Sequence, residues 1–433
     1  PAPAPAPAPG SVVFPLSISA NKRYLVDAAA QPFFLHADTP WSLLVQCTNA
    51  QIDTYLNDRQ GRGFNAVLVN LIEHYFSSQN PFYKEVTGNV PFAGMTQNVV
   101  NFAAPVEAYW SRVDYLVNAA KSRGMLVMAF PAYLGFGGGS ENANDQGWDS
   151  AVNRATDGSL RTYGAFLAGR YYQGNVIWSM GGDFNPTNPA KQWNIAVGIR
   201  SINANAIITG HGGRGTPASS IWAGQPGFNL NNIYCGTDGV SYALAAAEYG
   251  RAGPMPFFHI EGAYGNAETD AAVRRQAYQA ILAGACGHCF GTYPMWGLGE
   301  PHANSGIGAA ATLSGYLGTT ATLQIAQVKA LFSVFPWFKL APKTDTGLVT
   351  SSLGSGTNRV CPALATDRSF AMVLTTGASV TVNMSALAPS SIRARWFNTV
   401  DGSFTTASSS LLVNSGTITF TPSGERVLVL DAG

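Results

Sequence analysis

The sequence predicts an α/β protein: a (β/α)8 TIM barrel followed by a small antiparallel β-sandwich. Short apolar runs alternate with amphipathic segments from about residue 33 to residue 335, and runs such as Val67-Leu-Val-Asn70 are apolar on both faces, which is typical of parallel strands covered by helices. After about residue 340, helical periodicity gives way to short β-rich stretches, which predicts the sandwich. A doubly wound sheet is the alternative for the first part, but eight strand–helix alternations favour a closed barrel.

The composition divides the chain into three parts. Residues 1–14 begin with PAPAPAPAPG and are predicted to be a tail or linker, because alternating Pro and Ala favours polyproline II and cannot pack a core. Residues 15–338 are assigned to the barrel and residues 339–433 to the sandwich, which we expect either to pack behind the barrel or to be joined to it by a short link near 340–344.

Eight apolar runs are predicted to be the barrel strands: Phe33–His36, Asn65–Asn70, Met125–Phe130, Val176–Met180, Ile207–Gly210, Ile233–Cys235, Phe257–Ile260 and His288–Gly291. Four segments between them repeat apolar residues at helical spacing: 105–124, which has Pro105 in its first turn, and 160–172, 271–283 and 323–335. The sandwich strands are predicted at 369–375, 379–383, 392–397, 417–421 and 426–430, between turn signals such as Asp401-Gly402.

The low charge content excludes two classes of partner. Only 11% of residues are charged and the net charge is +1, so the sequence predicts no basic surface for nucleic acid or an anionic membrane. No apolar run reaches eighteen residues, so no membrane span is predicted. We expect a secreted protein that faces neutral polymers; the oligomeric state is left open.

Two of the five cysteines form the motif Cys286-Gly-His-Cys289, which has the spacing of a dithiol oxidoreductase. That chemistry needs the first cysteine at a helix N-terminus, where the helix dipole lowers the thiol pKa. Here the motif follows a predicted helix and enters a predicted strand. We therefore expect core cysteines or a local disulfide.

Polar and aromatic side chains follow the predicted strands, where barrel proteins bind their substrates. Almost none of them is Lys or Arg, and aromatic faces beside carboxylates suit a neutral sugar ring. The candidate sugar-binding residues are Asp38, Trp41, His74, Tyr133, His211, Tyr264 and Trp296. Five of them have a structural alternative: Asp38 could cap a turn, the tryptophans could fill the core, and the histidines could be hydrogen-bonding structural residues.

Two carboxylates stand out by position. Asp183 follows the fourth predicted strand and Glu261 follows the seventh, and these strands face each other across a barrel mouth. Hydrolysis of a glycosidic bond needs such a pair, one to protonate the leaving oxygen and one to attack the anomeric carbon or activate water. The alternative is that each acid caps the next helix.

Two rival functions are weighed against the glycosidase hypothesis. A metal-dependent hydrolase could use His36, Asp38 and His211 as ligands, but the sequence holds no His-x-His pair. A non-catalytic sugar-binding barrel would not need two opposed acids. The sequence therefore favours an enzyme without a metal or an organic cofactor.

Several motifs resemble the apiosidase-like glycoside hydrolases (glycoside hydrolase family 140). They are Phe34-Leu-His-Ala-Asp-Thr-Pro-Trp41, Arg62-Gly-Phe-Asn65, Asn175-Val-Ile-Trp-Ser-Met-Gly-Gly-Asp183 and His259-Ile-Glu-Gly-Ala-Tyr264. The stretches Ala394–Asn398 and Phe420–Leu430 resemble the collagen-binding-type β-sandwich found in such proteins, a label from which we do not predict collagen binding.

The resemblance implies a retaining mechanism, with Asp183 as the acid/base and Glu261 as the nucleophile. It also implies an oligo- or polysaccharide substrate of plant or microbial origin. Many related barrels carry Asn-Glu where this chain has Gly182-Asp183, and the glycines would let a shorter acid approach the bond. His36-Ala37 and the Gly- and Asn-rich loop 135–150 also depart from the family pattern, so the sugar stays open.

Overall fold

The computed structural model describes residues 12–96, 99–136, 146–172, 174–236, 239–298 and 313–433. Residues 1–11 of the predicted tail, and most of the Gly- and Asn-rich loop, lie outside the described residues. Val12 and Phe14 pack against the core. No helix in the described ranges is both long enough and apolar enough to cross a membrane.

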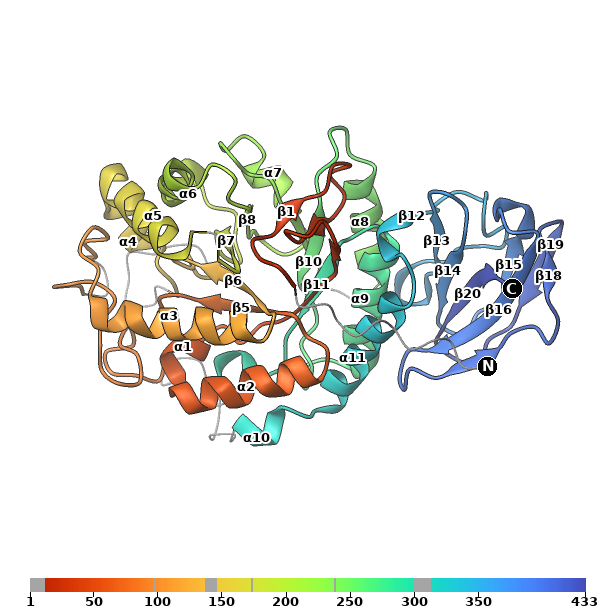
Figure 1. The fold of residues 1–433 in the computed structure, drawn as a ribbon, viewed down its shortest axis with the longest axis horizontal. Coiled ribbons are helices and arrows are strands. Elements are labelled where there is room, and N and C mark those ends of the chain that lie inside the picture. Colours follow the sequence, from red (N-terminus) through yellow and green to blue (C-terminus); the bar gives the residue numbers. More distant parts are fainter. Residues whose placement is uncertain (1–11, 97–98, 137–145, 173, 237–238, 299–312) are drawn as a thin grey trace.

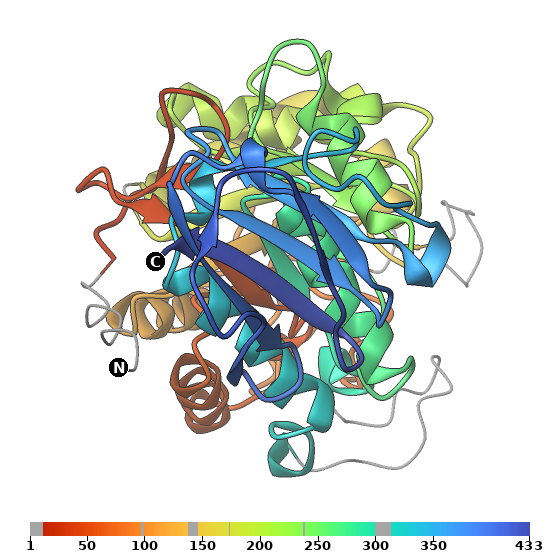
Figure 2. The same ribbon diagram turned by 90° about the vertical axis from the view of Figure 1, so that its right-hand side faces the viewer.

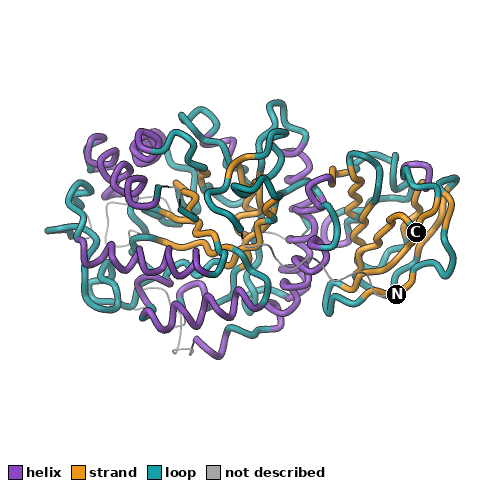
Figure 3. Tube along the Cα trace, in the orientation of Figure 1, coloured by secondary structure: helices purple, strands orange, loops and turns teal. Residues whose placement is uncertain are grey.

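Eight parallel strands surrounded by helices confirm the predicted barrel (Figures 1 and 3). They are paired in the order β8-β7-β6-β5-β4-β11-β10-β9. Their bounds are β4 Leu35–Asp38, β5 Ala66–Asn70, β6 Leu126–Phe130, β7 Val176–Met180, β8 Ile208–Gly210, β9 Asn231–Tyr234, β10 Phe257–Glu261 and β11 Gly287–Phe290. Almost every residue in them is buried on both faces, as helix-covered parallel strands require.

Side chains help to close the barrel between β8 and β9, the two ends of this strand order. The Asn232 side-chain amide donates to Thr209 Oγ1 at 2.9 Å and to the Gly210 carbonyl at 2.6 Å. The Ile208 carbonyl accepts bonds from the backbone N–H groups of Asn229 and Leu230, both at 3.2 Å. These bonds hold the strand ends that carry the site in a closed ring.

The first predicted strand is wrong in its bounds. Phe33 belongs to β3 (Pro32–Phe33), which pairs with β2 (Leu25–Val26) and β1 (Ser17–Ile18) in a separate antiparallel sheet. The chain crosses into the barrel at Phe34, so one apolar run spans two strands. Asp38 therefore ends β4 instead of following it.

The four predicted helices are present as α3 Glu107–Ser122, α5 Asp157–Tyr171, α9 Asp270–Leu282 and α11 Thr320–Ser333. Thr156, Thr269 and Thr319 each accept a bond from the backbone N–H three residues on, which begins α5, α9 and α11. The other helices are α1 Leu43–Gln46, α2 Asn49–Gly61, α4 Asp149–Arg154, α6 Pro189–Ile202, α7 Ser219–Trp222, α8 Ser241–Tyr249 and α10 Leu313–Tyr316.

The motif Cys286-Gly-His-Cys289 lies where the chain leaves α9 and enters β11. Both thiols are free and buried, and burial raises the pKa of Cys286 to about 12. A thiol with so high a pKa stays protonated and unreactive at neutral pH. These are core cysteines.

The C-terminal part is a β-sandwich, as predicted (Figure 2). One sheet has the order β12-β13-β14-β20-β16-β17, with β18 paired to β16, and β15 pairs with β19. The bounds are β12 Leu340–Pro342, β13 Cys361–Ala365, β14 Ala371–Thr375, β15 Val380–Asn383, β16 Ser391–Asn398, β17 Phe404–Thr406, β18 Leu412–Val413, β19 Thr417–Phe420 and β20 Arg426–Ala432. Of the two arrangements expected, the structure has the sandwich packed behind the barrel, and residues 340–342 form β12 of the sandwich sheet, paired with β13.

The larger sheet of the sandwich is buried on both faces. Met372 and Val427 belong to the core of the barrel, whereas Val373 and Leu428 belong to a second core inside the sandwich. Alternate residues of a strand point to opposite faces, so one sheet serves both cores. The sandwich is thus packed directly against the barrel helices.

Polar contacts add to this interface. The Tyr242 hydroxyl on α8 donates to the Pro362 carbonyl at 2.5 Å. Glu425 accepts a bond from Arg274 Nε at 2.6 Å and one from Arg275 Nη1 at 3.2 Å, both on α9. Only 6% of the Arg274 side chain is exposed, so its charge depends on this partner.

We predict that Glu425→Gln lowers the free energy of unfolding by about 3 kcal/mol, because it leaves the buried Arg274 guanidinium without its counter-charge. Urea unfolding measures this change. The matched control is Glu268→Gln on an exposed carboxylate, which should stay within about 0.5 kcal/mol of the parent. Equal unfolding curves for the two variants would contradict the prediction.

Candidate active site

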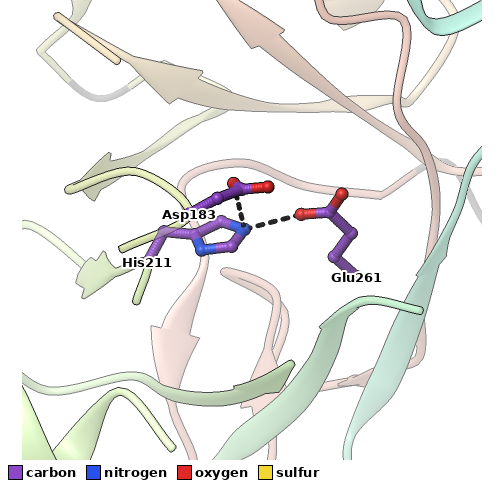
Figure 4. A group of neighbouring side chains, drawn as sticks. All are labelled: Asp183, His211 and Glu261. Carbon is purple, nitrogen blue, oxygen red and sulfur yellow. Dashed lines mark hydrogen bonds and ion pairs between the residues drawn. The ribbon is translucent and has the colours of Figure 1, made fainter. Parts of the chain in front are cut away.

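Three ionisable side chains meet at the C-terminal ends of the barrel strands (Figure 4). Asp183 follows β7, His211 follows β8, and Glu261 is the last residue of β10. One polar atom of each lies within 4.8 Å of the others. The barrel therefore brings the two predicted acids together, with His211 between them.

Two glycines determine where Asp183 lies. Gly181 has a φ of +94°, which residues with a side chain rarely adopt. A Cβ on Gly182 would lie 2.4 Å from the Gly135 carbonyl oxygen. The Asp183 N–H donates to that same carbonyl at 2.8 Å, so the loop after β6 fixes the backbone of the acid.

Glu261 is held by donors on both carboxylate oxygens. The Tyr264 hydroxyl donates to Oε1 at 2.8 Å, and it accepts a bond from Trp41 Nε1 at 3.1 Å. His211 Nε2 donates to Oε2 at 2.9 Å. This arrangement stabilises the ionised carboxylate and fixes its orientation.

Asp183 is surrounded by tyrosine hydroxyls. Tyr133 donates to Oδ1 at 3.0 Å and Tyr234 donates to Oδ2 at 3.3 Å. Burial, and then the neighbouring Glu261 carboxylate, raise the pKa of Asp183 to about 7. Asp183 can therefore carry a proton near neutral pH, as a general acid must.

His211 faces hydrogen-bond acceptors on both sides of its ring. Nδ1 lies 2.9 Å from the Gly212 carbonyl, and Nε2 lies 2.9 Å from Glu261 Oε2 and 3.5 Å from Asp183 Oδ1. Burial lowers the pKa of His211, but the two carboxylates outweigh it, so the pKa lies above its ordinary value. Both nitrogens then carry hydrogen, and the imidazolium offsets the charge of the paired acids.

The carboxylates open into a cavity of about 410 Å³. Its lining includes six of the predicted site residues: Trp41, Tyr133, Asp183, Glu261, Tyr264 and Trp296. Its other lining residues are Asn70, Phe76, Phe136, Arg214 and Tyr234. The predicted residue His211 lies behind the two acids, fully buried.

Two further predicted sugar-binding residues do not line the cavity. Asp38 is buried in an ion pair with Arg59 and accepts a bond from the Tyr55 hydroxyl at 2.5 Å. This internal contact fixes α2 to β4. His74 is buried against the rings of Phe82 and Trp148.

Tyr234 and Asn70 line the cavity but are not among the predicted site residues. Both are the last residues of their strands, β9 and β5, and only positions beyond the predicted strand ends were considered. A polar residue that ends an apolar run, as in Val67-Leu-Val-Asn70, was a usable signal. Phe76 and Phe136 lie in loops, where spacing alone gave no signal.

A family model described as "Apiosidase-like, catalytic domain" matches residues 19–339, the whole barrel. The chain belongs to the apiosidase-like family. It is therefore, by family, a hydrolase of glycosidic bonds. A second model, "Putative collagen-binding domain of a collagenase", matches residues 344–431.

Solved structures share the fold of this apiosidase-like protein. A glycoside hydrolase family 5 protein from Bacteroides vulgatus ATCC 8482 is 20% identical with a TM-score of 0.81, over 98% of this chain and 96% of that one. Another structure, titled "Glycoside hydrolase", is 21% identical with a TM-score of 0.80, over 96% and 97% of the two chains. At these identities the likeness supports the architecture alone. None of the curated proteins compared with the chain matches it.

The metal ligands suggested by the sequence do not meet in the apiosidase-like barrel. His36 Nδ1 lies 2.8 Å from His288 Nε2, its ring stacks on Phe64, and Asp38 is paired with Arg59. Within the described ranges, Asp183, His211 and Glu261 are spaced closely enough to hold a cation. However, His211 Nε2 is bonded to Glu261, so the group fits a proton network better than a metal site.

We predict that Gly182→Ala lowers kcat/KM of the apiosidase-like enzyme about a hundredfold. The new Cβ must displace the Gly135 backbone, which moves Asp183 out of register with Glu261. The measurement is steady-state kinetics on folded protein. Gly169→Ala is the control, because no atom lies within 4 Å of its added Cβ. Equal kcat/KM for the two variants would show that Asp183 tolerates the displacement.

Proposed function

We propose that the protein is a retaining glycosidase that cleaves a neutral glycosidic bond in a plant or microbial glycan, with Asp183 as acid/base and Glu261 as nucleophile. One observation carries the proposal. Two carboxylates, one following β7 and one ending β10, share one cavity, and their oxygens approach within 4.8 Å. Family membership supports the reaction class, and the geometry supports the roles.

In the first step, the Asp183 carboxyl gives its proton to the glycosidic oxygen while Glu261 attacks the anomeric carbon. The bond from that carbon to the leaving oxygen breaks, and a glycosyl ester forms on Glu261. His211 and Tyr264 each donate to one oxygen of Glu261 and fix its orientation before the attack.

In the second step, Asp183 takes a proton from water, and the water oxygen attacks the anomeric carbon. Glu261 leaves as a carboxylate. The Nε2–H of His211 and the Tyr264 hydroxyl stabilise the negative charge that returns to it. Two displacements retain the anomeric configuration.

The spacing of the acids favours retention over inversion. Retaining enzymes hold the carboxyl groups about 5–5.5 Å apart, whereas inverting enzymes separate them by about 6.5–9.5 Å to admit water. An oxygen–oxygen approach within 4.8 Å agrees with the shorter class.

The cavity lining supports a sugar substrate. Trp41, Phe76, Phe136 and Trp296 offer aromatic faces for the C–H-rich faces of sugar rings, and the tyrosine hydroxyls add polar contacts. A sugar-binding barrel without activity would not need an acid with a raised pKa beside a second carboxylate. Secretion stays a prediction from composition.

We predict that Asp183→Asn and Glu261→Gln each remove at least 99.9% of turnover on a natural glycan while the protein stays folded. Anomer-resolved NMR of the first product should show the configuration of the substrate. Activity screening over a panel of plant and microbial glycans supplies that substrate.

Two controls accompany these variants. Circular dichroism should match the parent, and EDTA should leave the parent rate unchanged. Near-parental turnover by either variant would refute its role, an inverted first product would refute double displacement, and a rate lost in EDTA would favour the metal alternative.

We predict that kcat/KM falls above about pH 7. Because the pKa of Asp183 is raised, the carboxyl holds its proton below that pH and loses it above, so the proton for the leaving oxygen disappears. The rate should fall about tenfold for each further increase of one in pH.

The control substrate is a 2,4-dinitrophenyl glycoside, whose leaving group departs as a phenolate without a proton. Its kcat/KM should not follow the same decline. If kcat/KM falls in parallel for both substrates above pH 7, a group other than Asp183 causes the decline.

A further inference from the structure

Asn70 is a buried amide in the wall of the cavity, and the mechanism above does not use it. It ends β5, the strand opposite β9 and Tyr234 in the barrel order. Its backbone N–H donates to the Trp41 carbonyl at 2.8 Å, and only 1% of the residue is exposed. Asn70 lines the same cavity as Asp183 and Glu261.

A carboxyl group sets the orientation of this amide. Asn70 Nδ2 donates to Glu73 Oε2 at 3.1 Å. Glu73 also accepts a bond from the Ser42 hydroxyl at 2.6 Å and one from the His74 backbone N–H at 2.8 Å. Because Glu73 accepts all three bonds, the N–H side of the Asn70 amide is turned toward it and the Oδ1 side is turned away.

Oδ1 of Asn70 has no hydrogen-bond partner among the described residues. Buried polar atoms are nearly always paired in folded proteins, so an unpaired acceptor at a cavity wall indicates a donor on the ligand.

The location distinguishes this amide from others. Asn175 and Asn232 also have an Oδ1 without a partner in the described part of the chain, but neither lines the cavity. Their amides donate to backbone carbonyls at strand ends and hold the barrel together. Of these three amides, only that of Asn70 can complete its hydrogen bonds with a ligand in the cavity.

We propose that Asn70 is a substrate-binding residue whose Oδ1 accepts the hydrogen of one hydroxyl on the sugar held between Asp183 and Glu261, and that Glu73 positions it. This inference rests on the proposed glycosidase function and adds a residue that selects for a hydroxyl at one ring position. A buried acceptor built for a hydroxyl discriminates against a sugar that lacks it.

The test uses the 4-nitrophenyl glycoside that the parent enzyme hydrolyses fastest from a panel of furanosides and pyranosides, together with its monodeoxy analogues. The parent should lose about tenfold or more in kcat/KM when one particular hydroxyl is removed. Asn70→Ala should lose about tenfold to a hundredfold on the full glycoside. For that one analogue, the variant and the parent should have similar kcat/KM.

Glu73→Gln tests the positioning role, because a glutamine N–H can donate to Asn70 Oδ1 and turn the amide over. The loss of kcat/KM caused by removing that one hydroxyl, here called the deoxy penalty, should disappear although Asn70 is intact. A general loss of packing would not produce this effect. Asn175→Ala is the matched control: it removes a buried barrel amide away from the cavity and should keep every deoxy penalty at the parental value.

Unchanged deoxy penalties in Asn70→Ala would overturn the inference and leave the glycosidase proposal intact. If Asn70→Ala does not fold, the Glu73→Gln result decides in the same way. A parent enzyme that neither binds nor hydrolyses any glycoside in the panel would overturn both proposals together.

Discussion

The contact of His211 with the carboxylates of Asp183 and Glu261 is the interaction on which the site depends. Two carboxylates this close repel each other when both are charged, so the site needs a cation or a proton between them. The imidazole ring of His211 donates on both sides, to Gly212 O at 2.9 Å and to Glu261 Oε2 at 2.9 Å. It is therefore a cation that lies between the two carboxylates. With one proton on Asp183, the trio carries no net charge, which suits its burial.

The fold provides the framework for that contact. The backbone N–H of His211 donates to the Met180 carbonyl at 2.6 Å. This bond joins the end of β8 to the end of β7, just before Gly181 and Asp183. Asn232 joins β8 to β9, and the ladder continues to β10 and Glu261. The sandwich shares a core with the barrel helices and holds α9 through Glu425, so it supports from outside the helix that follows Glu261 and β10.

Much of this could be predicted from sequence, for physical reasons. Periodicity identified the strands, and a closed barrel brings the ends of strands four and seven to one mouth, so Asp183 and Glu261 followed from order alone. The structural role of Asp38 could not be predicted in this way. Its partner Arg59 lies on α2, and the sequence spacing of the two residues does not reveal that they form an internal ion pair. Tyr234 and Asn70 were not predicted to line the cavity. The direction of a side chain at a strand end depends on register, and only the pairing with neighbouring strands defines the register.

The most direct test of the central claim is covalent trapping. A 2-deoxy-2-fluoro glycoside of the preferred sugar with a dinitrophenyl leaving group slows the second step, and peptide mass spectrometry locates the trapped sugar. We expect one sugar, attached to Glu261 and absent from Glu261→Gln. A sugar attached to another residue, or full turnover without any trapped intermediate, would contradict it.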